Sequence, residues 1–275
     1  MTKKGSTYFG RAVMAAFALV YLFPFLVSLL LSVKSKQETA KSVLSLPGTI
    51  HWENFSEAIE KAKIWRSMSN SIIVTAASVI IVIVAASMAG YAIGRQYHKK
   101  GYRLYESILT AAMMVPFQAL MIPLYRMFRT FGLLNTLPGV IILIAGINMP
   151  FAIMTYIGFI RTIPVEMEEA AMLEGCNKWQ TFTKVIFPIL QPTTVTIAVL
   201  DALWAWNDFN ASLIILQKDN VKTIPMQQYV FFGEHSANYN MAFASAVISM
   251  IPVVFFFIIM QSRIQEGMTA GAVKG

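Results

Sequence analysis

The sequence contains little charge and almost no cysteine. Only 13% of its 275 residues are charged, against about 25% in a typical soluble domain, and 56% are hydrophobic. Together with a mean hydropathy of +0.59, this composition excludes an ordinary soluble domain and predicts a chain that lies mostly in lipid. The single cysteine, Cys176, excludes an internal disulfide and is best interpreted as a small packed thiol.

Residues that support enzymatic or nucleotide chemistry are also scarce. His51, His98 and His235 fall in three separate predicted loops, which disfavours a membrane enzyme with convergent metal ligands, so we expect no metal site and no catalytic residue. No G-x-x-x-x-G-K-[ST] loop is present, and the chain is therefore not expected to hydrolyse ATP alone. The net charge of +8 has no polar, basic domain to carry it, which disfavours nucleic acid and favours loops beside anionic lipid.

Long apolar segments alternate with short polar loops along the chain. A helix needs about 20 residues to cross the hydrocarbon core of a bilayer. The predicted spans are residues 9–33, 70–94, 105–128, 137–160, 188–216 and 241–262. The first apolar run is too long for a cleavable signal peptide. We therefore expect an all-α, polytopic membrane protein with six transmembrane helices that form a single transmembrane domain over residues 1–275.

The loop after the second span sets the predicted orientation. Arg95, Lys99, Lys100 and Arg103 crowd this short loop, and the positive-inside rule places such a loop in the cytoplasm. Six spans put both termini on one side of the membrane. We therefore expect both termini, and the loop after the fourth span, to be cytoplasmic.

The second span ends in a run of small residues. They are Ala85, Ala86, Ser87, Ala89 and Gly90. Small side chains let two helix backbones approach closely in lipid. We therefore predict a helix-packing face here.

The loop after the fourth span is acidic where the positive-inside rule predicts bases. Residues 164–175 include four glutamates and no base. Pro164 suits a first helical position, Gly175 suits a left-handed C-cap, and Asn177 has capping-box spacing to Gln180. The pattern predicts a helix over residues 164–175, a tight turn and a second helix. Acids also stabilise the start of any helix, but a stretch this acidic favours an external partner.

The order of residues in this stretch resembles the "EAA" signature of permease subunits in ATP-binding-cassette (ABC) importers. The matching residues are Glu169, Ala170, Ala171, Gly175, Val185, Ile186, Phe187 and Pro188. The family more often has Asp at position 174, Ile at 185 and Leu at 187, which are mild departures. The resemblance implies a helix that docks into a groove on a separate ATPase, with Glu169, Ala170, Ala171, Glu174 and Gly175 as coupling residues.

The end of the chain resembles the C-terminus of carbohydrate-uptake permeases of the maltose type. Residues 267–275 carry this similarity, and residues 122–125 and 132–136 extend it over nearly the whole chain. It implies a type I ABC importer permease fold in the bacterial inner membrane. It further implies a tail that contacts two copies of the ATPase through Thr269, Gly271 and Lys274. The implied partners also include a second, different permease and an extracytoplasmic sugar-binding protein at residues 217–240. ATP and Mg would be bound by the ATPase, and this chain would hold no cofactor.

Polar residues at membrane depth are candidates for a substrate pathway. Asp201, Trp204, Asp208 and Ser212 recur at i, i+3, i+7 and i+11, so they would share one face of a continuous helix. Asp201 is expected either to line a pathway or to receive a hydrogen bond from Gln118 or Asn148 of another helix. Residues 206–209 also resemble a recurring segment of sugar importers. The full set of candidates is Gln118, Asn148, Asp201, Trp204, Asn207 and Asp208.

Three functions remain open from the sequence. The first is a permease subunit of an ATP-driven sugar importer that works by alternating access. The second is the same machinery with another solute, such as glycerol phosphate. The third is a proton-coupled secondary carrier, which would use acids such as Asp201 and Asp208 and would need no ATPase.

Overall fold

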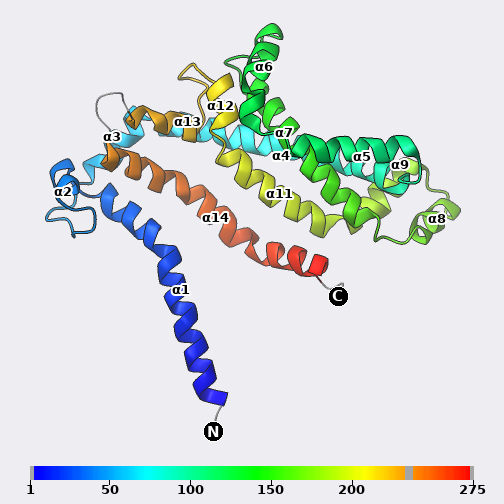
Figure 1. The fold of residues 1–275 in the computed structure, drawn as a ribbon, viewed down its shortest axis with the longest axis horizontal. Helices are drawn as coiled ribbons and strands as arrows, with labels where there is room; N and C mark the ends of the chain where they lie inside the picture. The colour runs from blue at the N-terminus through cyan, green and yellow to red at the C-terminus, as the bar shows by residue number, and fades with distance from the viewer. Residues whose placement is uncertain (1–2, 233–237, 273–275) are drawn as a thin grey trace. The chain divides into compact units, whose positions relative to one another are not determined.

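Every element that could be assigned is a helix. The structure, a computed structural model, describes residues 3–232 and 238–272, with side chains for residues 10, 11, 13–232 and 238–261. The first half contains α1 (Lys3–Ser32), α2 (Lys36–Lys41), α3 (Glu53–Lys61), α4 (Ile64–Arg95), α5 (Lys100–Met113), α6 (Phe117–Thr130) and α7 (Leu137–Ile160). The second half contains α8 (Glu166–Leu173), α9 (Lys178–Thr181), the π-helix η1 (Phe182–Ile186), α10 (Phe187–Ile189), α11 (Gln191–Trp206), α12 (Asn210–Ile215), α13 (Ile224–Gln228), the 3-10 helix η2 (Tyr229–Phe231) and α14 (Tyr239–Ala272) (Figure 1).

Within the described part of the chain, four helices are long and apolar enough to cross a membrane by themselves. They are Val13–Ser32, Ile64–Arg95, Leu137–Ile160 and Tyr239–Gln261. Two bent pairs supply a fifth and a sixth span if each is counted once: Lys100–Met113 with Phe117–Thr130, bent by 103°, and Lys178–Ile189 with Gln191–Trp206, bent by 73°. The predicted all-α membrane fold is thereby confirmed, and the described helices allow four to six spans.

Prolines explain why the third and fifth predicted spans are broken. Pro116 is the N-cap of α6, and its fixed φ with no N–H donor ends the preceding helix. Pro192 stands in the first turn of α11, directly after the break at Leu190 where the helices bend by 73°. Predicted spans 105–128 and 188–216 therefore correspond to pairs or triplets of shorter helices.

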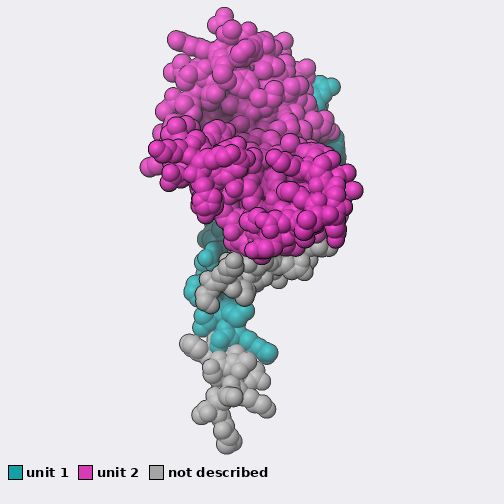
Figure 2. All heavy atoms as spheres, turned by 90° about the vertical axis from the view of Figure 1, so that its right-hand side faces the viewer, with its two compact units in different colours: residues 1–66, 227–252 teal, residues 67–226, 253–275 magenta. Residues whose placement is uncertain are grey.

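The chain forms two compact units, shown in different colours in Figure 2. Unit 1 comprises residues 1–66 and 227–252, and unit 2 comprises residues 67–226 and 253–275. In unit 1 the end of α1 is held by a buried polar cluster. The Lys34 ammonium donates to the carbonyls of Ser42 (2.7 Å) and Ser45 (2.8 Å), and the amides of Asn54 (2.9 Å) and Asn240 (2.8 Å) both donate to the Lys34 carbonyl. The same two amides also donate to the carbonyls of Ser32 and Leu31, which the end of α1 leaves without helical partners.

The core of unit 2 is formed where α4 packs against α7. A Cβ atom on Gly90 would lie 2.6 Å from Cβ of Tyr156, so only glycine allows this approach. Ala86 and Ser87 are also buried. The predicted packing face is confirmed for these three residues; Ala89 is partly buried against the same core, and Ala85 is exposed.

A turn before α7 closes the other end of unit 2. Asn135 takes a left-handed φ of 59°, and its side-chain oxygen accepts the N–H groups of Gln217 (2.7 Å) and Lys218 (2.8 Å). Its own N–H donates to the carbonyl of Ile215 at 2.8 Å. One asparagine thus fixes the segment after α12 to the start of α7.

Candidate functional site

The acidic stretch forms a short helix, α8, that lies with α9 at one end of unit 2 (Figure 1). The helix begins at Glu166, two residues later than predicted, because Pro164 is not helical. The carbonyl before it, on Ile163, accepts a bond from Nη1 of Arg95 at 2.8 Å. The N-cap of α8, Val165, already has helical angles, with φ of −69° and ψ of −26°, and makes no side-chain capping bond.

Gly175 ends α8 as predicted, with a left-handed φ of 90°. Its N–H donates to the carbonyl of Met172 and the N–H of Cys176 donates to the carbonyl of Ala171, both at 3.0 Å. This pair of bonds is a Schellman motif, in which a left-handed residue satisfies the last helical carbonyls. No other atom lies within 4 Å of a Cβ placed on Gly175, so glycine is required here by its φ and not by crowding.

The predicted capping box at the start of α9 is also confirmed. The Asn177 side chain accepts the N–H of Gln180, and the Gln180 side chain accepts the N–H of Asn177, both at 2.9 Å. The turn between α8 and α9 is therefore fixed by local bonds on both sides.

Glu168 anchors α8 to the end of α4. This carboxylate is 6% exposed. It accepts hydrogen bonds from Nε of Arg95 at 2.5 Å and from the hydroxyl of Tyr91 at 2.6 Å. Nη1 of Arg95 also donates to the carbonyl of Ile160, the last residue of α7, at 3.0 Å. We call Tyr91, Arg95 and Glu168 the anchor; it joins α8 to the ends of two long helices.

Sequence reasoning missed the anchor. It interpreted Arg95 only as a marker of a cytoplasmic loop and Glu168 as an acid at the start of a helix. The available signal was an unexplained acidic loop after one span and an unusually basic loop after another. The anchor neutralises one of the four glutamates within the chain and leaves Glu166, Glu169 and Glu174 exposed.

The outer face of α8 combines these acids with apolar side chains. Leu173 is 90% exposed, and Met167 and Met172 are also exposed. Among the predicted coupling residues, Glu169, Ala170, Glu174 and Gly175 are exposed and Ala171 is buried beneath the helix. Exposed apolar residues next to acids are typical of a surface that binds another protein.

The predicted pathway residue Asp201 is buried in α11. It is 2% exposed, and neither carboxylate oxygen has a hydrogen-bond partner among the described residues. The side chain of Asn148, on α7, is the polar group that interacts with this carboxylate, but the contact does not meet hydrogen-bond geometry. The hydrogen bond expected from Gln118 is not formed; Gln118 is exposed on α6.

The prediction that Asp208 and Ser212 share the helix face of Asp201 is wrong. α11 ends at Trp206, and the carboxylate of Asp208 accepts the N–H groups of Ala211 (3.2 Å) and Ser212 (2.9 Å), which starts α12. Local capping by an aspartate thus overrides the helical period. Asn207 donates its amide to the carbonyl of Leu203 at 2.8 Å and is exposed.

Trp204 stays on the face of Asp201 and is 44% exposed. Its ring meets Phe151 of α7 edge-on, with centroids 5.0 Å apart and planes at 73°. Aromatic rings prefer this geometry because the edge of one ring is positive and the face of the other is negative. An exposed aromatic surface therefore lies on the helix that carries the buried acid.

The remaining predictions concern the tail and metal binding. Thr269 and Gly271 belong to α14, where the structure describes the backbone but not these side chains. Lys274 and His235 lie outside the described residues. Within the described part of the chain, no three His, Cys, Asp or Glu residues are grouped so that they could hold a metal ion.

Comparison with known proteins identifies relatives over nearly the whole chain. Residues 82–270 match the family described as "Binding-protein-dependent transport system inner membrane component". The chain is 34% identical to the probable starch degradation products transport system permease protein AmyC of Thermoanaerobacterium thermosulfurigenes, over 94% of this chain and 93% of the relative. It is also 34% identical to the melibiose/raffinose/stachyose import permease protein MelC of Bacillus subtilis, over 95% and 94%.

Solved structures share the fold. A chain in the crystal structure of a bacterial ABC transporter involved in the import of the acidic polysaccharide alginate matches with a TM-score of 0.79 and 23% identity, over 95% of this chain and 97% of that one. A chain of a bacterial alginate ABC transporter in complex with alginate pentasaccharide-bound periplasmic protein matches with a TM-score of 0.67 and 16% identity, over 95% and 96%. These likenesses confirm the predicted permease fold.

Proposed function

Since the chain belongs to the family of inner membrane components of binding-protein-dependent transport systems, we propose that it is a permease subunit of an ATP-driven oligosaccharide importer. The observation that carries this proposal is α8, an exposed acidic and apolar helix that is bonded rigidly to two long helices. Such a helix can receive a push from a soluble motor and pass it to the membrane part.

The proposed partners follow the same reasoning. Two copies of an ATPase bind ATP and Mg, and one of them receives α8 through Glu169, Ala170, Ala171, Glu174 and Gly175. The tail residues Thr269, Gly271 and Lys274 reach the ATPases as well. A second, different permease completes the pore, and an extracytoplasmic protein delivers the sugar. We place α8 and both termini in the cytoplasm, because the basic loop after α4 meets α8 through the anchor.

In this mechanism the ATPases close when they bind ATP, and α8 moves with them. Arg95 and Ile160 are bonded together at the anchor, so α4 and α7 follow α8 as one body. The cavity then opens outward and accepts sugar. Asp201, Trp204 and Asn148 are the candidate residues along the pathway, with Gln118, Asn207 and Asp208 as weaker candidates because of their positions in the structure.

The choice of oligosaccharide as substrate is supported by the relatives, whose names refer to starch degradation products and to melibiose, raffinose and stachyose. An exposed tryptophan on α11 is compatible with a sugar face. Glycerol phosphate is the alternative solute within the same machinery.

Reconstitution of the complete transporter in liposomes tests the proposal. The importer requires ATP on the side of the liposome membrane where the ATPases lie and the binding protein on the opposite side. A labelled oligosaccharide is the transported solute. Uptake that depends on all three supports the proposal. Uptake by this chain alone, driven by a proton gradient without ATP, would contradict it and would favour the secondary carrier, for which the buried Asp201 carboxyl is the supporting observation.

A further inference from the structure

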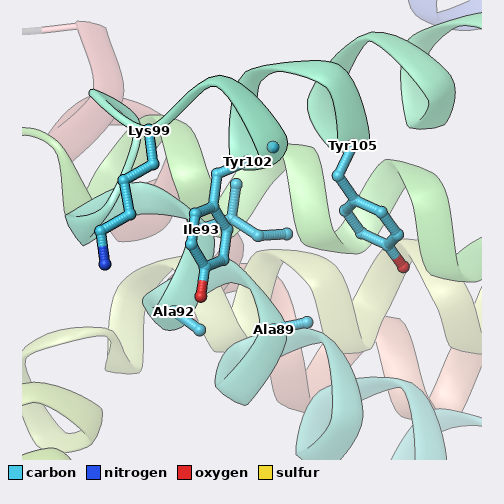
Figure 3. A pocket seen from close by; sticks show the side chains of 7 residues that line it. Ala89, Ala92, Ile93, Lys99, Tyr102 and Tyr105 are labelled. Carbon is cyan, nitrogen blue, oxygen red and sulfur yellow. The ribbon is translucent and has the colours of Figure 1, made fainter.

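We propose that a groove between α4 and the start of α5 binds an anionic phospholipid from the leaflet on the side of α8. The groove has a volume of about 620 Å³, within the range of small-molecule sites. Figure 3 shows its two walls: Ala89, Ala92 and Ile93 on α4, and Lys99, Tyr102 and Tyr105 at the start of α5. This inference goes beyond the proposed transport function and depends only on membrane location.

The α4 wall offers an apolar floor for an acyl chain. Ala89, Ala92 and Ile93 belong to a helix that is long and apolar enough to span the membrane. Two of these side chains are single methyl groups, so they leave space beside the helix that α5 does not fill. In a membrane, an apolar groove that opens to the bilayer is filled by lipid, because neither water nor a polar solute gains by entering it.

The second wall supplies polar groups from the segment that follows Arg95, the last residue of the candidate span α4. Lys99, the N-cap of α5, and Tyr102 and Tyr105 of α5 extend toward α4 (Figure 3). The Lys99 ammonium donates to Oε1 of Gln96 at 2.7 Å, which occupies one of its three N–H donors. Tyrosine is enriched at the membrane interface because its ring is apolar and its hydroxyl is polar. A phosphate at Lys99 and glycerol oxygens at the tyrosines would match these groups.

Charge favours an anionic lipid over a zwitterionic one. Lys99, Lys100 and Arg103 form no ion pair with an acid among the described residues. The nearby acids are occupied: Glu168 is bonded to Arg95 in the anchor, and Glu106 is paired with Arg161 at 2.7 Å. These three bases, which no acid among the described residues neutralises, therefore attract a negative headgroup. The start of α5 has no side-chain cap, so its first N–H groups favour an anion as well.

Native mass spectrometry of the assembled transporter tests this inference. The transporter is purified in nanodiscs that contain equal amounts of phosphatidylglycerol and phosphatidylcholine, and retained lipids are identified after release. We expect phosphatidylglycerol to be retained preferentially. Lys99→Gln should weaken this preference about fivefold, as one base near a membrane surface contributes a factor of this size. Arg129→Gln, which removes an exposed base at the end of α6, is the matched control and should change nothing.

A second variant tests the groove independently of charge. Ala92→Leu fills the floor and leaves all three bases in place, so it should displace the lipid as strongly as Lys99→Gln. Photo-crosslinking from Tyr105, replaced by a photoreactive residue, identifies the neighbour directly. Crosslinks to phospholipid in the assembled transporter support the proposal. Crosslinks to the second permease instead would overturn it, as would equal retention of both lipids or displacement of the lipid by excess inorganic phosphate.

Discussion

Two carboxylates in unit 2 are almost equally buried but differ in their surroundings. Glu168, 6% exposed, has an arginine and a tyrosine bonded to it, whereas Asp201, 2% exposed, has no hydrogen-bond partner among the described residues. A buried charge is stable only when it is paired and hydrogen-bonded. Glu168 is therefore part of a rigid joint between helices, whereas Asp201 forms no such joint.

Breaking the joint should have the largest effect. Arg95→Ala leaves the Glu168 carboxylate buried with only Tyr91, and loss of one partner of a buried pair costs about 3–5 kcal/mol. We expect a clear drop in the thermal unfolding temperature of the purified protein in detergent. The control is Arg161→Ala, because the pair of Arg161 with Glu106 is partly exposed, at 34% and 22%, and should contribute only about 0–1 kcal/mol. Equal losses in both variants would contradict the comparison.

The next largest effect is expected at Gly175, which ends α8. Gly175→Leu forces a branched side chain into a left-handed conformation, which costs about 1–2 kcal/mol. We expect normal membrane insertion but loss of transport-coupled ATP hydrolysis in the assembled complex. Asparagine tolerates this conformation better, so Gly175→Asn should retain most activity. Unchanged transport by Gly175→Leu would show that α8 does not transmit movement.

The same amide substitution at the two acids should have opposite effects. Glu168→Gln removes charge from a satisfied pair and should lower the unfolding temperature. Asp201→Asn removes charge from a site without partners and should leave the temperature unchanged or raise it. Unfolding in detergent, followed by tryptophan fluorescence, measures both. A loss of stability at Asp201→Asn would mean that its carboxylate has a partner in the free protein.

The smallest expected effect concerns a third carboxylate, that of Glu38, at the surface of unit 1. The N–H groups of Ser35 and Gly48 hold the pKa of Glu38 down to about 2. Because the folded pKa is depressed below its ordinary value of 4.5, the stabilisation is present above about pH 4.5 and is lost as the pH falls toward 2. Pepsin cleavage of residues 42–50 should therefore increase only near pH 2, and Glu38→Gln should be cleaved throughout the acidic range. Identical pH profiles would contradict the cap.

What could be predicted from sequence was chiefly local. The left-handed Gly175 and the capping box of Asn177 with Gln180 follow from neighbouring residues, and six apolar runs were sufficient to give the fold class. The anchor was not predicted because Arg95 and Glu168 lie 73 residues apart and meet only when α4 packs on α7. The prediction that Asp208 shares the face of Asp201 was wrong because helical periodicity was assumed to continue past a residue that starts a new helix.

Whether the anchor transmits the motion of α8 is tested most directly by the number of sugar molecules that the transporter imports per ATP hydrolysed in liposomes. Glu168→Ala is the informative variant, because Arg95 keeps its bonds to Ile160 and Ile163 while α8 loses its anchor. Glu169→Ala, on the exposed face, is the comparison, and it should weaken association with the ATPase. For Glu168→Ala we predict normal association and continued ATP hydrolysis, with a several-fold lower ratio of sugar to ATP. A ratio equal to that of the unaltered protein would contradict the proposal that the anchor transmits the motion of α8.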